Sequence, residues 1–187
     1  MKKKLISKLL FVSFFIALFP LNISAENFQP AVIGILDIQR IKKESKAIIS
    51  IRDQITSERV KYEKKFRSNE EILRKEEQEI AKQRTVLSEE AFKKKNNEFR
   101  KKVQSLQEKM QKASQRLQKA EAEAIREFNN NLRPILIESS NAYSVNVVLF
   151  ASQVAFAPRS LDLTSDVMKR LDIAIPNIKV KFQDLAN

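Results

Sequence analysis

Between Gly34 and Pro134 the chain contains no proline and no further glycine. Those residues are the strongest interrupters of regular structure, so a polar stretch of this length predicts a long helix or a coiled coil.

Because Gly34 is the only glycine in 187 residues, a glycine-rich phosphate loop is excluded. The absence of histidine and cysteine excludes zinc sites, thiol nucleophiles, histidine-based triads and disulfides. A metal site made only of carboxylates remains open, although the acidic residues are dispersed among lysines, and we expect no cofactor and no catalysis.

Apolar residues recur at heptad spacing in both halves of this stretch. On the outgoing half they are Phe66, Leu73, Ile80 and Leu87, with polar Asn69, Glu76 and Gln83 between them. The returning half has a stronger seam, made of Phe92, Phe99, Val103, Leu106, Met110, Ala113, Leu117, Ala120 and Ala124, with Asn96 as its polar member. Alternating spacings of three and four are typical of the a and d positions of a coiled coil.

The two halves, residues 37–87 and 89–142, are expected to meet at Ser88. Its hydroxyl can cap a helix start, and Glu89 and Glu90 then lie in the first turn, where the helix dipole favours negative charge. Folding the weaker seam against the stronger one predicts an antiparallel hairpin about 70 Å long at 1.5 Å per residue. A single straight helix is the alternative. Pro134 should kink the returning helix, either as a hinge for the hairpin or only to direct its last turns.

The N-terminus has the pattern of a signal peptide. Lys2, Lys3 and Lys4 form a positive start, an apolar run extends from Leu9 to Phe19, and Ile-Ser-Ala ending at Ala25 is a plausible cleavage site. A retained membrane anchor is the alternative, but that run is short for a bilayer and no cysteine follows to carry lipid. Removing Lys2, Lys3, Lys4 and Lys8 lowers the formal charge of +12 to +8 for the exported chain. A basic mature chain suggests an anionic partner, although lysines also keep long helices soluble.

Short apolar runs at the two ends of the mature chain predict a small sheet. Ala31–Leu36 and Val145–Phe150 are apolar on both faces, a third strand is expected at Val154–Phe156, and residues 178–182 suggest one more. A short helix is expected from Thr164 or Ser165 to about Leu171. An isolated small sheet with two apolar faces is not stable in water, so we expect several chains to pack their sheets together.

Taken together, the exported basic chain, the first strand "AVIGILDIQRI", the charged hairpin and the ending "VNVVLFASQVAFAPRSLDLTSDVMKRL" resemble the Skp/OmpH family of periplasmic chaperones. The resemblance covers essentially the whole mature chain, and the ending is its most specific part. It implies a mainly α fold with a small β association domain: a homotrimer shaped like a jellyfish, in which long antiparallel helical-hairpin arms project from a β-rich body around a cavity. The cavity would hold unfolded outer-membrane proteins without ATP, in the periplasm.

This reading divides the chain into a signal peptide (1–25), a discontinuous β-rich association domain (26–42 and 131–187) and the hairpin arm (43–130), with its tip near 85–90. The expected trimer core consists of Ile33, Ile35, Val147, Val148, Leu149 and Phe150. The expected client-binding residues are the basic clusters Lys93, Lys94 and Lys95, and Arg100, Lys101 and Lys102.

Some members of that family are also thought to bind lipopolysaccharide, so the resemblance implies transient contact with lipopolysaccharide or an anionic membrane. The matching positions support only Lys119, and Glu127 stands where a basic residue is expected, so that site is not carried over.

Two other classes of function are open. A structural coiled-coil tether between envelope components, without chaperone activity, would show a lipidated cysteine or an anchor segment. A nucleic-acid-binding protein is suggested by charge alone. Export argues against nucleic acid as a partner, and the interleaved aromatic residues of a stacking surface are missing.

Overall fold

The computed structural model describes residues 29–183. The signal peptide and the cleavage site expected at residues 1–25 lie outside the described residues. The described residues from Ala31 onward belong to one compact unit, whose fold is given below. Within the described residues, no helix has both the length and the apolar character needed to span a membrane.

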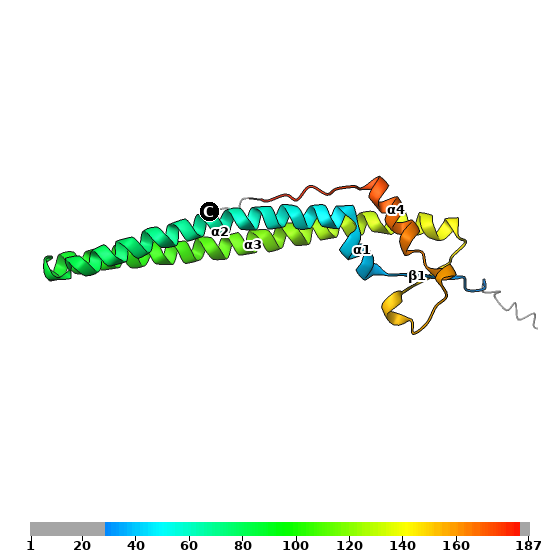
Figure 1. The fold of residues 1–187 in the computed structure, drawn as a ribbon, viewed down its shortest axis with the longest axis horizontal. Helices are drawn as coiled ribbons and strands as arrows, with labels where there is room; N and C mark the ends of the chain where they lie inside the picture. Colours follow the sequence, from blue (N-terminus) through cyan, green and yellow to red (C-terminus); the bar gives the residue numbers. More distant parts are fainter. Residues whose placement is uncertain (1–28, 184–187) are drawn as a thin grey trace, which may run out of the picture. The chain divides into compact units, whose positions relative to one another are not determined.

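Four α-helices and two strands make up this unit (Figure 1). In chain order they are β1 (Ile33–Leu36), α1 (Ile38–Glu44), α2 (Lys46–Lys82), α3 (Glu89–Ala142), β2 (Val147–Phe150) and α4 (Thr164–Ala174). Three short 3₁₀ helices lie between them: η1 (Gln83–Thr85), η2 (Ala151–Gln153) and η3 (Arg159–Leu161). The mainly α fold with a small β region is therefore confirmed.

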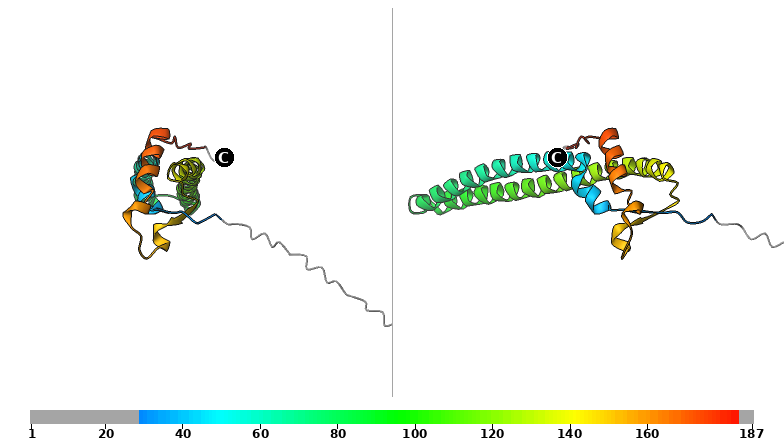
Figure 2. Two further views of the ribbon diagram at one scale, coloured as in Figure 1. Left: turned by 90° about the vertical axis from the view of Figure 1, so that its right-hand side faces the viewer. Right: turned by 45° about the vertical axis from the view of Figure 1, so that its right-hand side comes forward.

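The helices α2 and α3 run antiparallel and side by side as a long hairpin (Figures 1 and 2). The chain turns at η1, and the Ser88 hydroxyl accepts a hydrogen bond from the Ala91 amide at 3.3 Å, which caps α3 as predicted. Glu89 and Glu90 occupy the first turn of α3. The hairpin is confirmed, and the single straight helix is wrong.

The predicted seam is packed unevenly along the hairpin. Towards the body its members are buried: Leu106, Ala113, Leu117, Ala120 and Ala124. Towards the tip Leu73, Ile80 and Phe99 are only half-buried, and farther along the seam Met110, between buried Leu106 and Ala113, is exposed. The polar residues Asn69, Glu76 and Gln83 in the outgoing seam explain the difference, because they cannot fill the space between two helices as leucine does.

The outgoing half differs from the continuous helix expected from Asp37 onward. Asp37 caps α1 through its carboxylate, and α1 ends at Glu44 because the backbone of the next residue, Ser45, is extended with ψ 139°. The chain then changes direction into α2, and the Lys46 amide donates to the Asp172 carboxylate of α4 at 2.9 Å. Neither proline nor glycine marks this break, which a contact with α4 stabilises instead.

The sheet consists of β1 and β2 alone among the described residues, paired in parallel with Ile33 opposite Val147 and Leu36 opposite Phe150. The expected third strand at Val154–Phe156 is wrong. The chain folds into η2 after β2, and the free side of β1 is met by a single bridge between Ile35 and Asp162. The strand suggested at residues 178–182 is also wrong, because that segment lies on the hairpin and not beside another strand.

The core lies where the base of the hairpin meets the sheet and α4. Its largest fully buried side chain is Phe128 of α3, and Leu36 of β1 and Leu171 of α4 belong to the same cluster. The short helix expected near residues 164–171 is confirmed as α4.

Pro134 lies inside α3, which continues past it to Ala142, and Ile135 beside it is buried in the core.

Gly34 sits where the sheet comes closest to the segment before α4. A Cβ atom built at this position would lie 2.5 Å from Cδ1 of Leu163 and 3.0 Å from Cγ1 of Val145. The contact with Leu163 is shorter than real Cβ atoms make, so any larger residue would force this buried side chain to move. The only glycine of the chain is therefore explained by close packing.

Candidate functional surfaces

An apolar surface surrounds the two strands. Of the residues expected in a trimer core, Ile33, Val147, Leu149 and Phe150 are exposed, whereas Ile35 is buried and Val148 is half-buried against the chain's own core. The parallel pairing brings all six together in one small sheet. Phe156, in the loop after β2, is 87% exposed. Ile33, Val147 and Leu149 lie on one face of the sheet, and Phe150 lies at the end of β2. We name these four exposed residues together with Phe156 the sheet face.

The loop after β2 covers one end of this sheet. It forms a hollow of about 380 Å³ with Ile35, Val154, Phe156 and Pro158 in its lining. This loop explains why Ile35 is buried although its strand neighbour Ile33 on the same face is 37% exposed. Asp37, Arg159 and Asp162 also line this hollow, so it is only partly apolar. An exposed aromatic ring such as that of Phe156 is a common feature of surfaces that associate with other chains.

The two basic clusters lie on α3 near the tip of the hairpin, and all six side chains are exposed. Two of the six reach across to the outgoing half: Lys95 donates to the Gln83 side chain, and Lys102 forms an ion pair of 2.6 Å with Glu76. Such exposed pairs contribute at most about 1 kcal/mol. These two lysines therefore help to join the two helices where the seam is polar, in addition to any role towards a partner.

Open grooves follow the seam on the hairpin. One of about 290 Å³ lies beside Tyr62, Phe66, Met110 and Leu117, and the two rings stack with their centroids 5.8 Å apart. Two others lie beside Leu73 and Leu106, and Lys101, Lys102 and Lys109 line one of them. Half-exposed apolar groups next to cations can make many weak contacts with an unfolded chain that carries apolar and acidic residues. The sequence pattern identified the seam but not that its tip half stays open.

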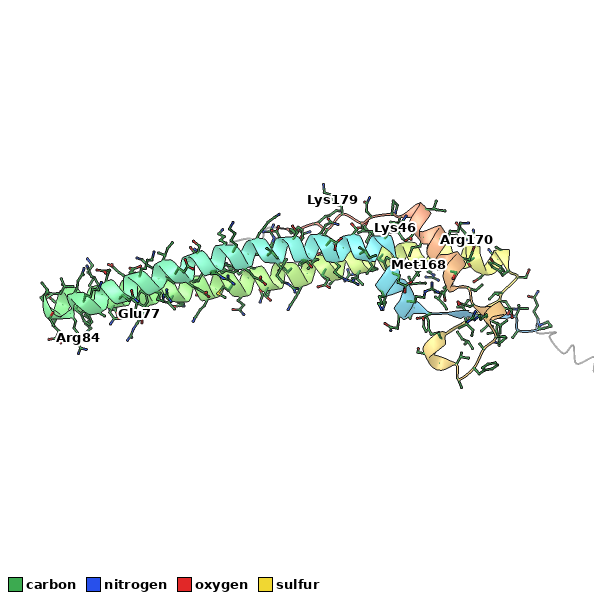
Figure 3. All side chains as sticks on the ribbon, in the orientation of Figure 1. Lys46, Glu77, Arg84, Met168, Arg170 and Lys179 are labelled. Carbon is green, nitrogen blue, oxygen red and sulfur yellow. The ribbon has the colours of Figure 1, made fainter. Side chains whose placement is uncertain are left out.

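The C-terminal residues form a further feature that the sequence did not reveal. Residues 176–183 are extended along the hairpin, and we name them the strap (Figures 1 and 2). Ile178 and Val180 are buried in the core, whereas Lys179 between them points away from the helices (Figure 3). The alternation Ile-Lys-Val-Lys-Phe is the sequence feature that marks this extended segment, but from the sequence alone it predicts a strand.

One ion pair in the body has a clear electrostatic effect. The Arg170 guanidinium lies 2.6 Å from the Asp166 carboxylate, one turn apart in α4, and holds the pKa of that carboxyl below its usual value. Partial burial works in the opposite direction but has the smaller influence on the pKa.

Within residues 29–183, no cluster of acidic residues could hold a metal ion.

Comparisons with known proteins agree with this architecture. A solved structure from Caulobacter crescentus CB15, described as a candidate outer membrane chaperone (OmpH-like), superposes with a TM-score of 0.78 at 18% identity, covering 85% of this chain and 98% of that one. At this identity the likeness establishes the fold alone. No curated protein sequence matches the chain. The family model for OmpH, outer membrane protein (OmpH-like), matches residues 32–171, most of the chain. The chain therefore belongs to the OmpH-like family.

Proposed function

We propose that the protein is an ATP-independent periplasmic holdase chaperone, which binds unfolded outer-membrane proteins between helical arms and prevents their aggregation. The observation that carries this proposal is the open part of the hairpin seam, where Leu73, Phe99 and Met110 remain accessible in one groove. Lysines line the second groove beside Leu73: Lys101, Lys102 and Lys109. A hairpin that served only as a rigid tether would gain stability by closing this seam. Membership of the OmpH-like family supports the same function.

The proposed working form is a homotrimer that associates through the sheet face. Ile33 and Val147 lie opposite each other with 37% and 38% of their surfaces exposed, and β2 has a neighbouring strand on one side only within the described residues. Covering an exposed strand edge and its apolar face is the usual way to protect such a sheet from aggregation. Trimer formation would place three hairpins around a common space.

Binding requires no reaction. A strand of an outer-membrane barrel alternates apolar and polar residues, so the unfolded chain exposes apolar side chains in water. Each groove can bind weakly, because three arms supply many contacts at once and raise the effective concentration of the next contact. The exposed lysines would attract acidic clients and increase the rate of capture. Export through a cleaved signal peptide is part of the proposal.

Shortening the arm tests the proposal. Phe66 and Met110 line one groove, so the two helices can be rejoined there by a flexible loop that replaces residues 67–109. This variant should retain the body, its assembly and the groove beside Tyr62, but it loses the two grooves beside Leu73. It should therefore suppress the aggregation of an unfolded outer-membrane β-barrel protein diluted from urea far less than the unmodified protein does. A full-length arm in which a glycine–serine loop replaces residues 83–88 is the matched control. Full suppression by the short-armed variant would overturn the assignment of the arm as the binding surface.

A further inference from the structure

The strap is held chiefly by its backbone and by alternate side chains. Ile178 and Val180 are 1% and 5% exposed and share a hydrophobic cluster with Ile51, Ile55 and Ala120 of the hairpin. Phe182 packs partly against the same cluster. Lys179 and Lys181 are exposed. The hairpin therefore contacts every second side chain of an extended segment.

Gln54 of α2 binds the strap as a neighbouring strand would. Its side-chain amide donates from Nε2 to the Ile178 carbonyl at 2.8 Å and accepts at Oε1 from the Val180 amide at 3.0 Å. A residue in a parallel β-ladder engages the same two groups, on either side of the residue opposite it. Ser50, one turn earlier, accepts from Gln54 Nε2 through its carbonyl and hydroxyl oxygens, both at 3.1 Å, and so orients the amide.

The opposite helix supplies a third backbone anchor. Nη2 of Arg116, on α3, donates to the Phe182 carbonyl at 2.6 Å, while Nη1 of the same guanidinium donates to the Tyr62 hydroxyl at 2.9 Å. Beyond it, Lys119 donates to the Gln183 side chain at 3.2 Å. Gln54 and Arg116 thus bind main-chain groups that every residue possesses. Recognition of this kind selects an extended conformation with apolar residues at alternate positions, largely independent of sequence.

We propose that the groove beneath the strap is a binding site for a single extended strand of an unfolded outer-membrane β-barrel chain, and that the strap occupies it until a client displaces it. The strap shows what fits: an extended segment with apolar side chains at every second position. Barrel strands have that alternation. This inference rests on the proposed function and assigns to it a specific site at the base of the arm, next to the groove beside Tyr62 and away from the two grooves beside Leu73.

Because the strap and a client strand compete for the same groove, the strap lowers the apparent affinity of the site for the client. The apparent affinity of a site equals its intrinsic affinity multiplied by the fraction of molecules in which it is open. A strap that is closed in about nine molecules of ten lowers the apparent affinity roughly tenfold. Changes in the strap that leave the groove untouched should therefore strengthen client binding, which is the opposite of what loss of an ordinary structural contact would do.

The first test changes the inward and outward positions of the strap separately. Ile178→Ser with Val180→Ser removes both apolar anchors, and Lys179→Ser with Lys181→Ser is the control with the same number of changes. The probe is a labelled ten-residue peptide of alternating valine and threonine with terminal lysines, followed by fluorescence anisotropy. We expect the inward variant to bind the peptide roughly tenfold more tightly than the unmodified protein, and the control to show no increase. Equal affinities in all three proteins would overturn the inference.

The second test holds the strap in place and does not depend on a variant with a weakened core. The chain has no cysteine, so Lys119→Cys with Gln183→Cys introduces the only two thiols, at side chains that contact each other. Closing them with a short bismaleimide should abolish peptide binding, while the unlinked double variant should bind like the unmodified protein. Unchanged binding after cross-linking would refute the site.

Aggregation of an unfolded outer-membrane protein, measured on the same samples, separates the two proposals. If the unmodified protein does not suppress it, the chaperone function is wrong. If it does, and the cross-linked protein also binds the peptide normally, only the strap site is wrong. Circular dichroism of the inward variant provides a check that the hairpin remains helical.

Discussion

Substitution of Val147 by aspartate separates folding of the chain from its assembly. Val147 lies on the sheet face, 38% exposed, opposite Ile33, which is equally exposed. In a single chain an aspartate at this position would remain in water, and the loss of strand propensity is at most about 1 kcal/mol. Val148 would be a poorer choice, because it is half-buried against the chain's own core and its replacement would disturb folding as well.

In an assembly that covers the sheet face, the same substitution has a much larger effect on the free energy of association. Fully burying a valine is worth about 1.5 kcal/mol, so covering the exposed part of Val147 contributes roughly 0.6 kcal/mol per chain. Burying an unpaired carboxylate costs at least about 2 kcal/mol, and a trimer would bury three of them. The total is at least roughly 6 kcal/mol, which lowers the assembly constant by about four orders of magnitude, since 1.4 kcal/mol is tenfold.

The assay is the mass of the particle, measured by light scattering across a range of protein concentrations, together with thermal unfolding followed by circular dichroism. Val147→Asp should be a folded monomer at concentrations where we expect the unmodified protein to be a trimer. Val60→Asp is the matched control, because Val60 is exposed on α2 away from the sheet, and it should remain trimeric. A Val147→Asp protein that stays trimeric would refute the sheet face as the association surface.

Three further outcomes are expected. Gly34→Ala should lower the free energy of unfolding in urea by about 1–3 kcal/mol, because the new methyl group meets Leu163. The pKa of Asp166 is depressed in the folded protein, so its pair with Arg170 stabilises the fold fully above about pH 4, and this stability is lost as pH falls through the folded-state pKa. The difference in unfolding free energy between the unmodified protein and Asp166→Asn should therefore shrink in that range, and a difference that does not change with pH would contradict this. Changing residues 93–95 and 100–102 to glutamine should slow stopped-flow capture of an acidic client and flatten its salt dependence, because salt shortens the Debye length from about 10 Å at 0.1 M to about 3 Å at 1 M.

The hairpin was predictable from the sequence because its determinants are local. Heptad spacing specifies which face of each helix is covered, and the Ser88 cap with two acidic residues after it specifies where α3 begins. The strands β1 and β2 were equally predictable as apolar runs bounded by turns. The break at Ser45 was not, because it depends on Asp172, far along the chain, which binds the first amide of α2.

The candidate surfaces were predictable only in part. The apolar strand residues identified the sheet face, but not that Ile35 is covered by the loop after β2 or that Val148 turns to the chain's own core. The six basic residues are exposed as expected, yet Lys102 also forms an ion pair across the hairpin, a contact set by the register of two helices that are joined only at the tip. Register between distant segments is not encoded in either pattern alone.

The strap shows why an alternating pattern does not identify its own partner. Alternation at residues 178–182 requires one covered face and backbone partners, and a neighbouring strand normally supplies both. Here the hairpin covers Ile178 and Val180, and the side chains of Gln54 and Arg116 replace the ladder. A helical surface that satisfies an extended backbone in this way has the properties needed to bind a barrel strand that has not yet found its own neighbours. The contacts from Gln54 and Arg116 thus explain why the strand prediction is wrong, and they also support the proposed binding site at the base of the arm.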